Sequence, residues 1–238
     1  MIVTAHQPLY MPWLGFFHKA ILSDVICILD NVQFADGDFI HRNKIKAIHG
    51  SKWLTIAVNK KDHFNKKISQ IEIVDQVWQE KHIETLRQSY SEAPFFENYM
   101  SDLEEIIGSS RYNYLIEIDM KLLAYLFGAL KITTKIVLAS DLSIQGKKSD
   151  FILSACGELK ASAYISGQNG KDYLNIEDFE SAGINIAMQK YNHPTYNQLH
   201  GDFLPNMSVI DLLFNEGPLS RDIIMRGNAG AWNELSLE

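Results

Sequence analysis

The first 30 residues constrain the possible fold more than any other part of the chain. A short apolar run over residues 2–5 precedes a proline-started helical pattern over 12–23, and a β-branched apolar run spans 25–29. Apolar runs of this kind are typical of parallel strands that are buried on both faces. Proline suits the first turn of a helix because its missing N–H would be unpaired there. The pattern therefore predicts a strand–helix–strand unit with a right-handed crossover.

The rest of the chain repeats the alternation of strands and helices, with one long helical interruption. Further strands are expected over 53–58, 68–74, 134–139, 163–166 and 184–189. Helices are expected near 150–160, 176–182 and 209–214, and residues 77–130 carry only the three- and four-residue spacing of buried helix faces. We therefore predict one α/β domain over residues 1–238. Its Rossmann-like, mainly parallel sheet is flanked by helices, with a helical insertion or subdomain over 76–130.

Charge and hydropathy exclude several classes of protein. The net charge of −7 argues against a partner that is nucleic acid or an anionic membrane, since both require an excess of Lys and Arg. No run of about 18 apolar residues suggests a membrane span, and no basic segment precedes the first apolar run as in a signal peptide. We expect a cytoplasmic protein without membrane insertion. The oligomeric state is left open.

The cysteines and several absent motifs narrow the chemistry. Cys27 and Cys156 both lie in apolar segments without CxxC spacing, which predicts two buried free thiols in a reducing compartment. The GxSxG motif of a serine hydrolase and the HExxH motif of a zinc enzyme are both missing. We therefore expect no metal site. A metal-dependent enzyme that uses His6, His193 and His200 remains an alternative.

Polar residues follow the predicted strands at the points where those strands end. His6 and Gln7 follow the first strand, and Asp30 follows the second, with Gln33, Arg42 and Asn43 soon after. In open α/β sheets, ligands bind beyond the carboxyl ends of the strands. These side chains are therefore candidates for substrate contacts.

Two later segments add candidates of the same kind. Ser166 and Gly167 end a predicted strand, and the following loop with a second glycine suits either backbone contact with a ligand or an ordinary turn. The loop before the last predicted helix is rich in polar and aromatic residues, among them Tyr196 and Gln198. Asp211 follows in that helix, where a structural role is an equally open reading.

A combination of short segments at both ends of the chain resembles a known family. The N-terminal segments are His6-Gln7-Pro8, Tyr10, Pro12-Trp13, Gly15, Asp24, Asp30, Val32-Gln33-Phe34, Arg42-Asn43, Ile45, Gly50 and Trp53-Leu54-Thr55. The C-terminal segments are Tyr164-Ile165-Ser166-Gly167, Tyr173-Leu174, Phe179, Gly183-Ile184, Tyr196, Gln198, Phe203, Pro205, Ser208, Asp211-Leu212-Leu213-Phe214-Asn215 and Gly217. Together they resemble the WbqC-like family, and the sequence departs from it at His41, where the family tends to have Asn.

The resemblance implies a biological setting and a class of reaction. Proteins of this family are associated with bacterial O-antigen and other surface-polysaccharide gene sets. The implied task is acyl or aminoacyl transfer to an amino sugar. The implied small-molecule substrates are a nucleotide-linked sugar and an acyl donor.

A second, topological similarity bears on the cofactor. The order of strand, His-Pro loop, helix and strand resembles HIGH-type nucleotidyltransferases and pantothenate synthetase, which hold ATP at the first helix. Trp13 and Phe16 stand where the histidines of the HxGH motif would fall. The similarity implies ATP with magnesium as a candidate cofactor for amide formation through an acyl adenylate. The cofactor is otherwise unknown.

These considerations give an explicit hypothesis for the site of a transferase or ligase. His6 and Arg42 would face phosphate or developing carboxylate charge, where fixed donors contribute most. Asp30 or Asp211 would accept a proton from the attacking amine. The expected catalytic residues are His6, Arg42 and Asp211. The expected substrate-binding residues are Gln7, Gln33, Asn43, Ser166, Gly167, Tyr196 and Gln198. The alternative is a non-enzymatic protein that binds a sugar nucleotide or acts as a scaffold.

Overall fold

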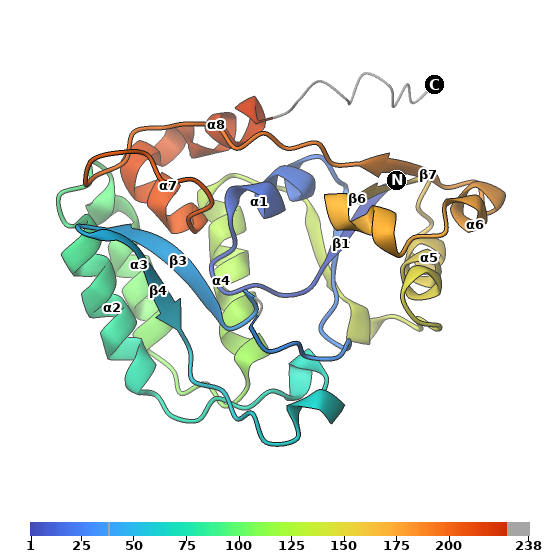
Figure 1. Cartoon of the computed structure of the whole chain (residues 1–238), viewed down its shortest axis with the longest axis horizontal. Coiled ribbons are helices and arrows are strands. Elements are labelled where there is room, and N and C mark those ends of the chain that lie inside the picture. The colour runs from blue at the N-terminus through green and yellow to red at the C-terminus, as the bar shows by residue number, and fades with distance from the viewer. Residues whose placement is uncertain (38, 228–238) are drawn as a thin grey trace.

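A parallel sheet of five strands forms the centre of the computed structural model, which describes residues 1–37 and 39–227 (Figure 1). Its strands, in spatial order, are β5 (Lys135–Leu138), β2 (Val25–Ile28), β1 (Ile2–His6), β6 (Ala163–Ser166) and β7 (Asn185–Met188). The chain winds outward from β1 to β5 and then returns to the other side of β1. The predicted Rossmann-like α/β fold is thus confirmed, and the strand order reverses between β1 and β6.

Helices cover both faces of the sheet and divide the apolar residues into two cores (Figure 1). On one face, the larger core joins α1 (Leu14–Ile21), α2 (Val77–Tyr90), α3 (Phe96–Gly108), α4 (Leu115–Ala129), α7 (Val209–Glu216) and α8 (Ser220–Arg226). On the other face, the smaller core joins α5 (Ser149–Glu158) and α6 (Ile176–Ser181) to the sheet. Helices α2, α3 and α4 follow one another without an intervening strand of the sheet, and they share their core with α1. A helical insertion over 76–130 stays a prediction.

The alternation of side chains along β1 and β2 explains how one sheet serves both cores. Val3, Val25 and Cys27 point into the smaller core, whereas Ile26 and Ile28 belong to the larger one. Cys27 and Cys156 are free and buried, as predicted. Burial raises the pKa of both thiols to about 12, so they stay protonated and unreactive at neutral pH.

Two strand predictions between residues 42 and 74 were incomplete or wrong. The hairpin of β3 (Arg42–Ala47) and β4 (Gly50–Thr55) is antiparallel and separate from the main sheet. The expected strand over 68–74 is instead a 3₁₀ turn, Ile68–Gln70, followed by single bridge pairs such as Val58 with Ile73. Ile68, Ile71 and Ile73 are buried, but the turn keeps the backbone from forming a continuous ladder.

Short 3₁₀ helices make up the remaining regular structure of the described residues. They are η1 (His63–Asn65), η2 (Ile68–Gln70), η3 (Ala139–Asp141), η4 (Gln168–Asp172) and η5 (Gly217–Leu219). Within residues 1–37 and 39–227, none of the helices has the length and apolar character needed to cross a membrane.

Candidate functional site

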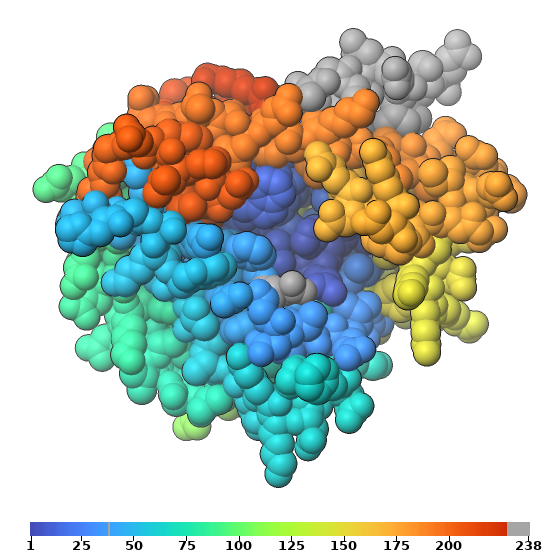
Figure 2. Space-filling model, in the orientation of Figure 1, coloured from blue at the N-terminus to red at the C-terminus, as the bar shows by residue number. Residues whose placement is uncertain are grey.

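The carboxyl ends of β1 and β6 mark the place where this topology favours ligand binding, because the strand order reverses between these two strands. Figure 2 shows the molecule hollowed near its middle, with dark-blue N-terminal residues at the floor of the hollow. Lighter-blue residues that follow β2 border it from below, and yellow-orange residues around η4 border it on the right.

Lys19 of α1 brings a buried positive charge to this strand edge. Its Nζ donates to the carbonyl oxygen of Ala5 at 3.3 Å and lies 3.9 Å from where a Cβ on Gly167 would stand. The residue is only 4% exposed, and no carboxylate among the described residues forms an ion pair with it. Burial lowers its pKa from 10.5 to about 8. Lys19 is therefore an ammonium group at neutral pH with donors left for a ligand.

His6 ends β1 beside this ammonium. Its Nδ1 donates to the carbonyl oxygen of Gln7 at 2.9 Å, because a carbonyl can only accept, so Nε2 is the acceptor nitrogen of the ring. Burial and the neighbouring Lys19 charge lower the pKa of His6 from 6.5 to about 3. His6 is therefore a neutral hydrogen-bond acceptor at pH 7, held edge-on against Phe16.

Residues at the carboxyl end of β6 line the other side of this strand edge. Ser166 is buried, and its Oγ donates to the carbonyl oxygen of Gly167 at 3.1 Å. A Cβ on Gly170 would lie only 1.9 Å from that Oγ, so the turn into η4 requires a glycine at position 170. At Gly167, in contrast, the nearest atom to an added Cβ is Lys19 Nζ. The backbone of Gly167 is thus adjacent to the ammonium group.

Gln189, which directly follows β7, fixes α1 relative to the sheet. Its Nε2 donates both to the carbonyl oxygen of Gly15 and to Nδ1 of His18, each at 2.9 Å. Burial lowers the pKa of His18 to about 4, which keeps the ring neutral and able to accept. Because Lys19 is the next residue of the same helix, this contact helps to hold its side chain toward β1.

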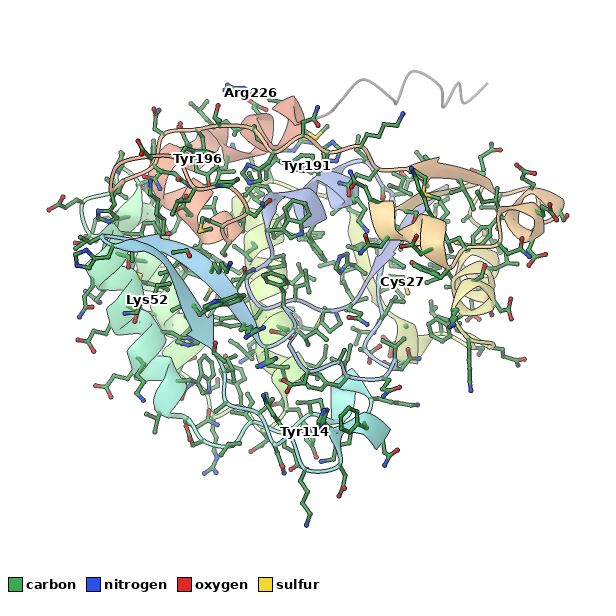
Figure 3. The ribbon with its side chains drawn as sticks, in the orientation of Figure 1. Cys27, Lys52, Tyr114, Tyr191, Tyr196 and Arg226 are labelled. Carbon is green, nitrogen blue, oxygen red and sulfur yellow. The ribbon has the colours of Figure 1, made fainter. Side chains whose placement is uncertain are left out.

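Asp211, Tyr196 and Gln198, which were predicted as site residues, form one hydrogen-bonded cluster. Asp211 accepts from Tyr90 Oη at 2.7 Å, from Tyr196 Oη at 2.8 Å and from Gln198 Nε2 at 2.7 Å. Asp211 has no exposed surface, and burial raises its pKa. These bonds fasten the segment 194–205 onto α2 and α7; Figure 3 labels Tyr196 near α7 and Tyr191 near α1.

Arg42, Asn43 and Gln33 lie on other elements. Asn43 is buried and donates to the carbonyl oxygens of Tyr10 at 3.2 Å and Met11 at 2.7 Å, so it holds the segment that leaves β1. Arg42 Nη2 donates to the carbonyl oxygen of Gly37 at 2.6 Å. Gln33 forms a single bridge pair with Lys67. None of these contacts reaches His6.

The predicted residues thus fall into separate groups. His6, Gln7, Ser166 and Gly167 share the strand edge between β1 and β6. The second group consists of Asp211, Tyr196 and Gln198. The third group consists of Arg42 and Asn43, which lie at the start of β3. The sequence reasoning did not identify Lys19 or Gln189. The available signal for Lys19 was a lysine between buried apolar residues of a helix, Phe17 and Ala20.

The comparisons with known proteins cover most of the chain. The chain matches the WbqC-like protein family over residues 7–223. It belongs to this family. An uncharacterized protein of Mycobacterium tuberculosis, Rv1507c, is 29% identical over 223 residues, which cover 93% of this chain and 96% of that protein. No solved structure matches the chain.

In this WbqC-like protein the three histidines of the alternative metal hypothesis are not gathered. Nδ1 of His193 donates to the carbonyl oxygen of Pro194, and Nε2 of His200 donates to that of Ser89. Within residues 1–37 and 39–227, no three His, Cys, Asp or Glu residues group as a metal ion requires. The hypothesis of a metal site formed by His6, His193 and His200 therefore has no support in this fold.

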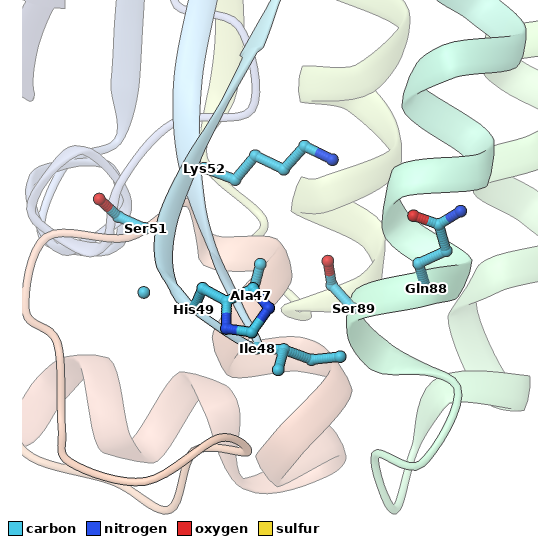
Figure 4. A pocket seen from close by; sticks show the side chains of 8 residues that line it. Ala47, Ile48, His49, Ser51, Lys52, Gln88 and Ser89 are labelled. Atoms are coloured by element: carbon cyan, nitrogen blue, oxygen red, sulfur yellow. The ribbon is translucent and has the colours of Figure 1, made fainter.

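A distinct pocket of about 310 Å³ lies away from the strand edge, at the turn between β3 and β4 (Figure 4). It is lined by residues 47–52 of the hairpin and by Gln88 and Ser89 of α2. Its lining contains none of the predicted catalytic or substrate-binding residues. We therefore take the edge between β1 and β6 as the candidate site of this WbqC-like protein.

Proposed function

We propose that this WbqC-like protein is a cytoplasmic enzyme of bacterial surface-polysaccharide (O-antigen-type) biosynthesis. It joins an acyl or aminoacyl group to the amine of a nucleotide-linked amino sugar and forms an amide. The acyl group comes either from an activated donor by direct transfer or from a carboxylate that ATP with magnesium activates. Family membership supports the setting, and the strand edge between β1 and β6 supports the chemistry.

One observation carries the proposal: Lys19 is a buried ammonium without a carboxylate partner among the described residues. Burying a charge lowers stability unless an opposite charge or several hydrogen bonds compensate for it. An anionic substrate group in the hollow would supply that compensation. Amide formation provides such groups, namely the donor carboxylate and the oxyanion that develops when the amine attacks the acyl carbon.

His6 is suited to position the attacking amine. Its ring is neutral at pH 7, and Nε2 is its acceptor nitrogen, so it can accept an N–H hydrogen of the amine and orient the lone pair toward the acyl carbon. The carboxylates of Asp30 and Asp211, predicted as proton acceptors, are both buried. Asp30 accepts from the amide of Ser140, and Asp211 has three donors. His6 is therefore the better candidate to contact the amine.

The test is a product assay by mass spectrometry. The purified protein is incubated with nucleotide-linked amino sugars and either acyl-CoA or a carboxylic acid with Mg-ATP. We expect a mass increase on the sugar nucleotide, and a rate about 100-fold lower in Lys19→Met because the oxyanion loses a charged donor. Lys81→Met, which removes an exposed lysine of α2, is the matched control and keeps the wild-type rate.

Two results would contradict the proposal. If Lys19→Met keeps the wild-type rate, the reaction does not occur at this strand edge. If the sugar nucleotide binds but no donor yields a product, the protein is a binding or scaffold protein instead of an enzyme.

A further inference from the structure

One face of the β3–β4 hairpin packs on the larger core, and the other is open to solvent except at Lys46, which is buried. Residues that pair directly across an antiparallel ladder share a face, and here Lys44 pairs with Trp53 and Arg42 with Thr55. The opposite face carries Ile45 and Leu54, which are buried in the larger core. Figure 4 shows this alternation directly, since Lys52 points toward α2 while Ser51 points to the other side.

The outward face gathers two cations around one exposed indole. Arg42 Cζ lies 4.5 Å and Lys44 Nζ 4.9 Å from the centre of the Trp53 ring. Trp53 is 40% exposed, and the ring of Phe39, itself 44% exposed, lies 5.7 Å away at an interplanar angle of 35°. We call Phe39, Arg42, Lys44 and Trp53 the cationic–aromatic face.

The charges of this face are uncompensated within the described part of the chain. No Asp or Glu there forms an ion pair with Arg42 or Lys44, whereas the nearby Lys60 is paired with Asp36 at 2.9 Å. Nε of Arg42 is buried and has no hydrogen-bond partner among the residues that the structure describes. In a chain with a net charge of −7, two adjacent cations without an ion-pair partner among residues 1–37 and 39–227 favour an anionic ligand.

The backbone ties the cationic–aromatic face to the candidate site. The amide of Tyr10 donates to the carbonyl oxygen of Phe39 at 3.1 Å, and Asn43 donates to the carbonyl oxygens of Tyr10 and Met11. Tyr10 and Met11 belong to the segment that connects β1 to α1. These hydrogen bonds therefore connect the face to the segment that follows His6, and Figure 2 shows lighter-blue residues around the hollow.

We propose that the cationic–aromatic face binds the nucleoside diphosphate part of the substrate. The base stacks on Trp53 and Phe39, since aromatic side chains provide a stacking surface for any base. Arg42 and Lys44 bind the diphosphate, for which a guanidinium group offers paired donors. This inference rests on the proposed function for the identity of the sugar. It adds the part of the molecule that holds the nucleotide while Lys19 and His6 contact the reacting groups.

Isothermal titration calorimetry with UDP and ADP tests the inference without any turnover. We expect at least one of the two to bind the wild-type protein. Trp53→Ala should weaken that binding at least about fivefold, which corresponds to the lower limit of base stacking. Arg42→Ala should weaken it about tenfold through loss of charge-assisted hydrogen bonds. The control is Lys52→Ala on the opposite face of the same hairpin, which should leave the affinity unchanged.

Several outcomes would overturn the inference. It is wrong if neither nucleotide binds, or if Trp53→Ala and Arg42→Ala bind as tightly as wild type. Equal affinity for inorganic pyrophosphate would rule out base stacking, and tighter binding of a short single-stranded oligonucleotide would make the face a nucleic-acid surface. Lys19→Met separates the two proposals, because it should retain UDP or ADP binding even though the proposed reaction is lost.

Discussion

At the scale of single residues, Lys19 shows the conflict between stability and the proposed chemistry. Its pKa falls from 10.5 to about 8, which corresponds to a cost on the order of 3 kcal/mol for keeping the ammonium charged in the fold. The sequence alone does not reveal this residue. A lysine in a helix is ordinarily exposed, and only the tertiary packing of α1 against β1 buries it.

Replacing this charge should therefore stabilise the protein. We predict that Lys19→Met raises the free energy of unfolding at pH 7 by about 1–3 kcal/mol, because an apolar side chain of similar length fills the same buried space. Urea denaturation measures the change. A loss of stability would mean that the ammonium is already well compensated in the absence of ligand, contrary to our account.

Asp211 represents the opposite case, a buried carboxylate whose donors are all supplied by the protein. We predict that Asp211→Ala destabilises the protein by about 3–5 kcal/mol, because Tyr90, Tyr196 and Gln198 lose their shared acceptor. Asp211→Asn should cost less, since its carbonyl oxygen still accepts. Equal stability of Asp211→Ala and wild type in thermal unfolding would exclude this structural role.

At the scale of elements, Trp13 and Gly15 define how α1 begins. The indole of Trp13 folds back over Gly15, and a Cβ there would lie 2.3 Å from the ring. We predict that Gly15→Ala lowers stability by about 1–3 kcal/mol through this clash, although alanine favours helices. Gly128→Ala in α4 is the control: nothing lies within 4 Å of its Cβ position. That change should stabilise by up to about 1 kcal/mol, and a similar sign for both variants in thermal unfolding would refute the argument.

The elements themselves were largely predictable from apolar periodicity. The strand over 163–166 matches β6, and most other bounds agree within a few residues. The prediction did not assign β3 as a strand, because Arg42, Lys44 and Lys46 alternate along it and leave Ile45 as the one strongly apolar residue between Asn43 and Ala47. Helix α8 was not predicted, and the strand expected over 68–74 is a 3₁₀ turn. The local sequence pattern indicates which residues are buried, but it does not indicate which segments pair through backbone hydrogen bonds.

At the scale of the whole molecule, the grouping of the predicted residues depended on contacts between distant segments. The sequence correctly indicated polar residues beyond the strands, and topology then brought His6 and Gly167 to one edge. It did not indicate that Asp211 would be enclosed by Tyr90, which is separated from it by 121 positions. Arg42 likewise belongs to a hairpin that is separate from the main sheet, and the local sequence pattern does not indicate this separation.

Three histidines with lowered pKa values should make the whole molecule sensitive to acid. Burial lowers the pKa of His6 to about 3 and of His18 and His82 to about 4, from 6.5. On acidification these histidines bind protons in the unfolded chain before they do so in the folded protein. Their contribution to the free energy of unfolding is therefore fully present above pH 6.5 and is lost as the pH falls toward 4. We predict a loss of roughly 1–2 kcal/mol per histidine between pH 6.5 and 5. Urea denaturation across this range measures it, and a flat profile would contradict the prediction. The slope should be smaller in His82→Gln, which has one such group fewer.

We propose above all that an anionic substrate binds Lys19 at the edge between β1 and β6 and compensates for its charge. A thermal-shift panel with Mg-ATP, acyl-CoA and nucleotide-linked amino sugars tests it most directly, because a ligand that binds only the folded state raises the Tm. We predict that at least one of these anions raises the Tm of wild type and of Lys81→Met by more than that of Lys19→Met, which keeps only the nucleotide contacts of the cationic–aromatic face. An equal rise in Lys19→Met, or no rise with any of these ligands, would contradict the account.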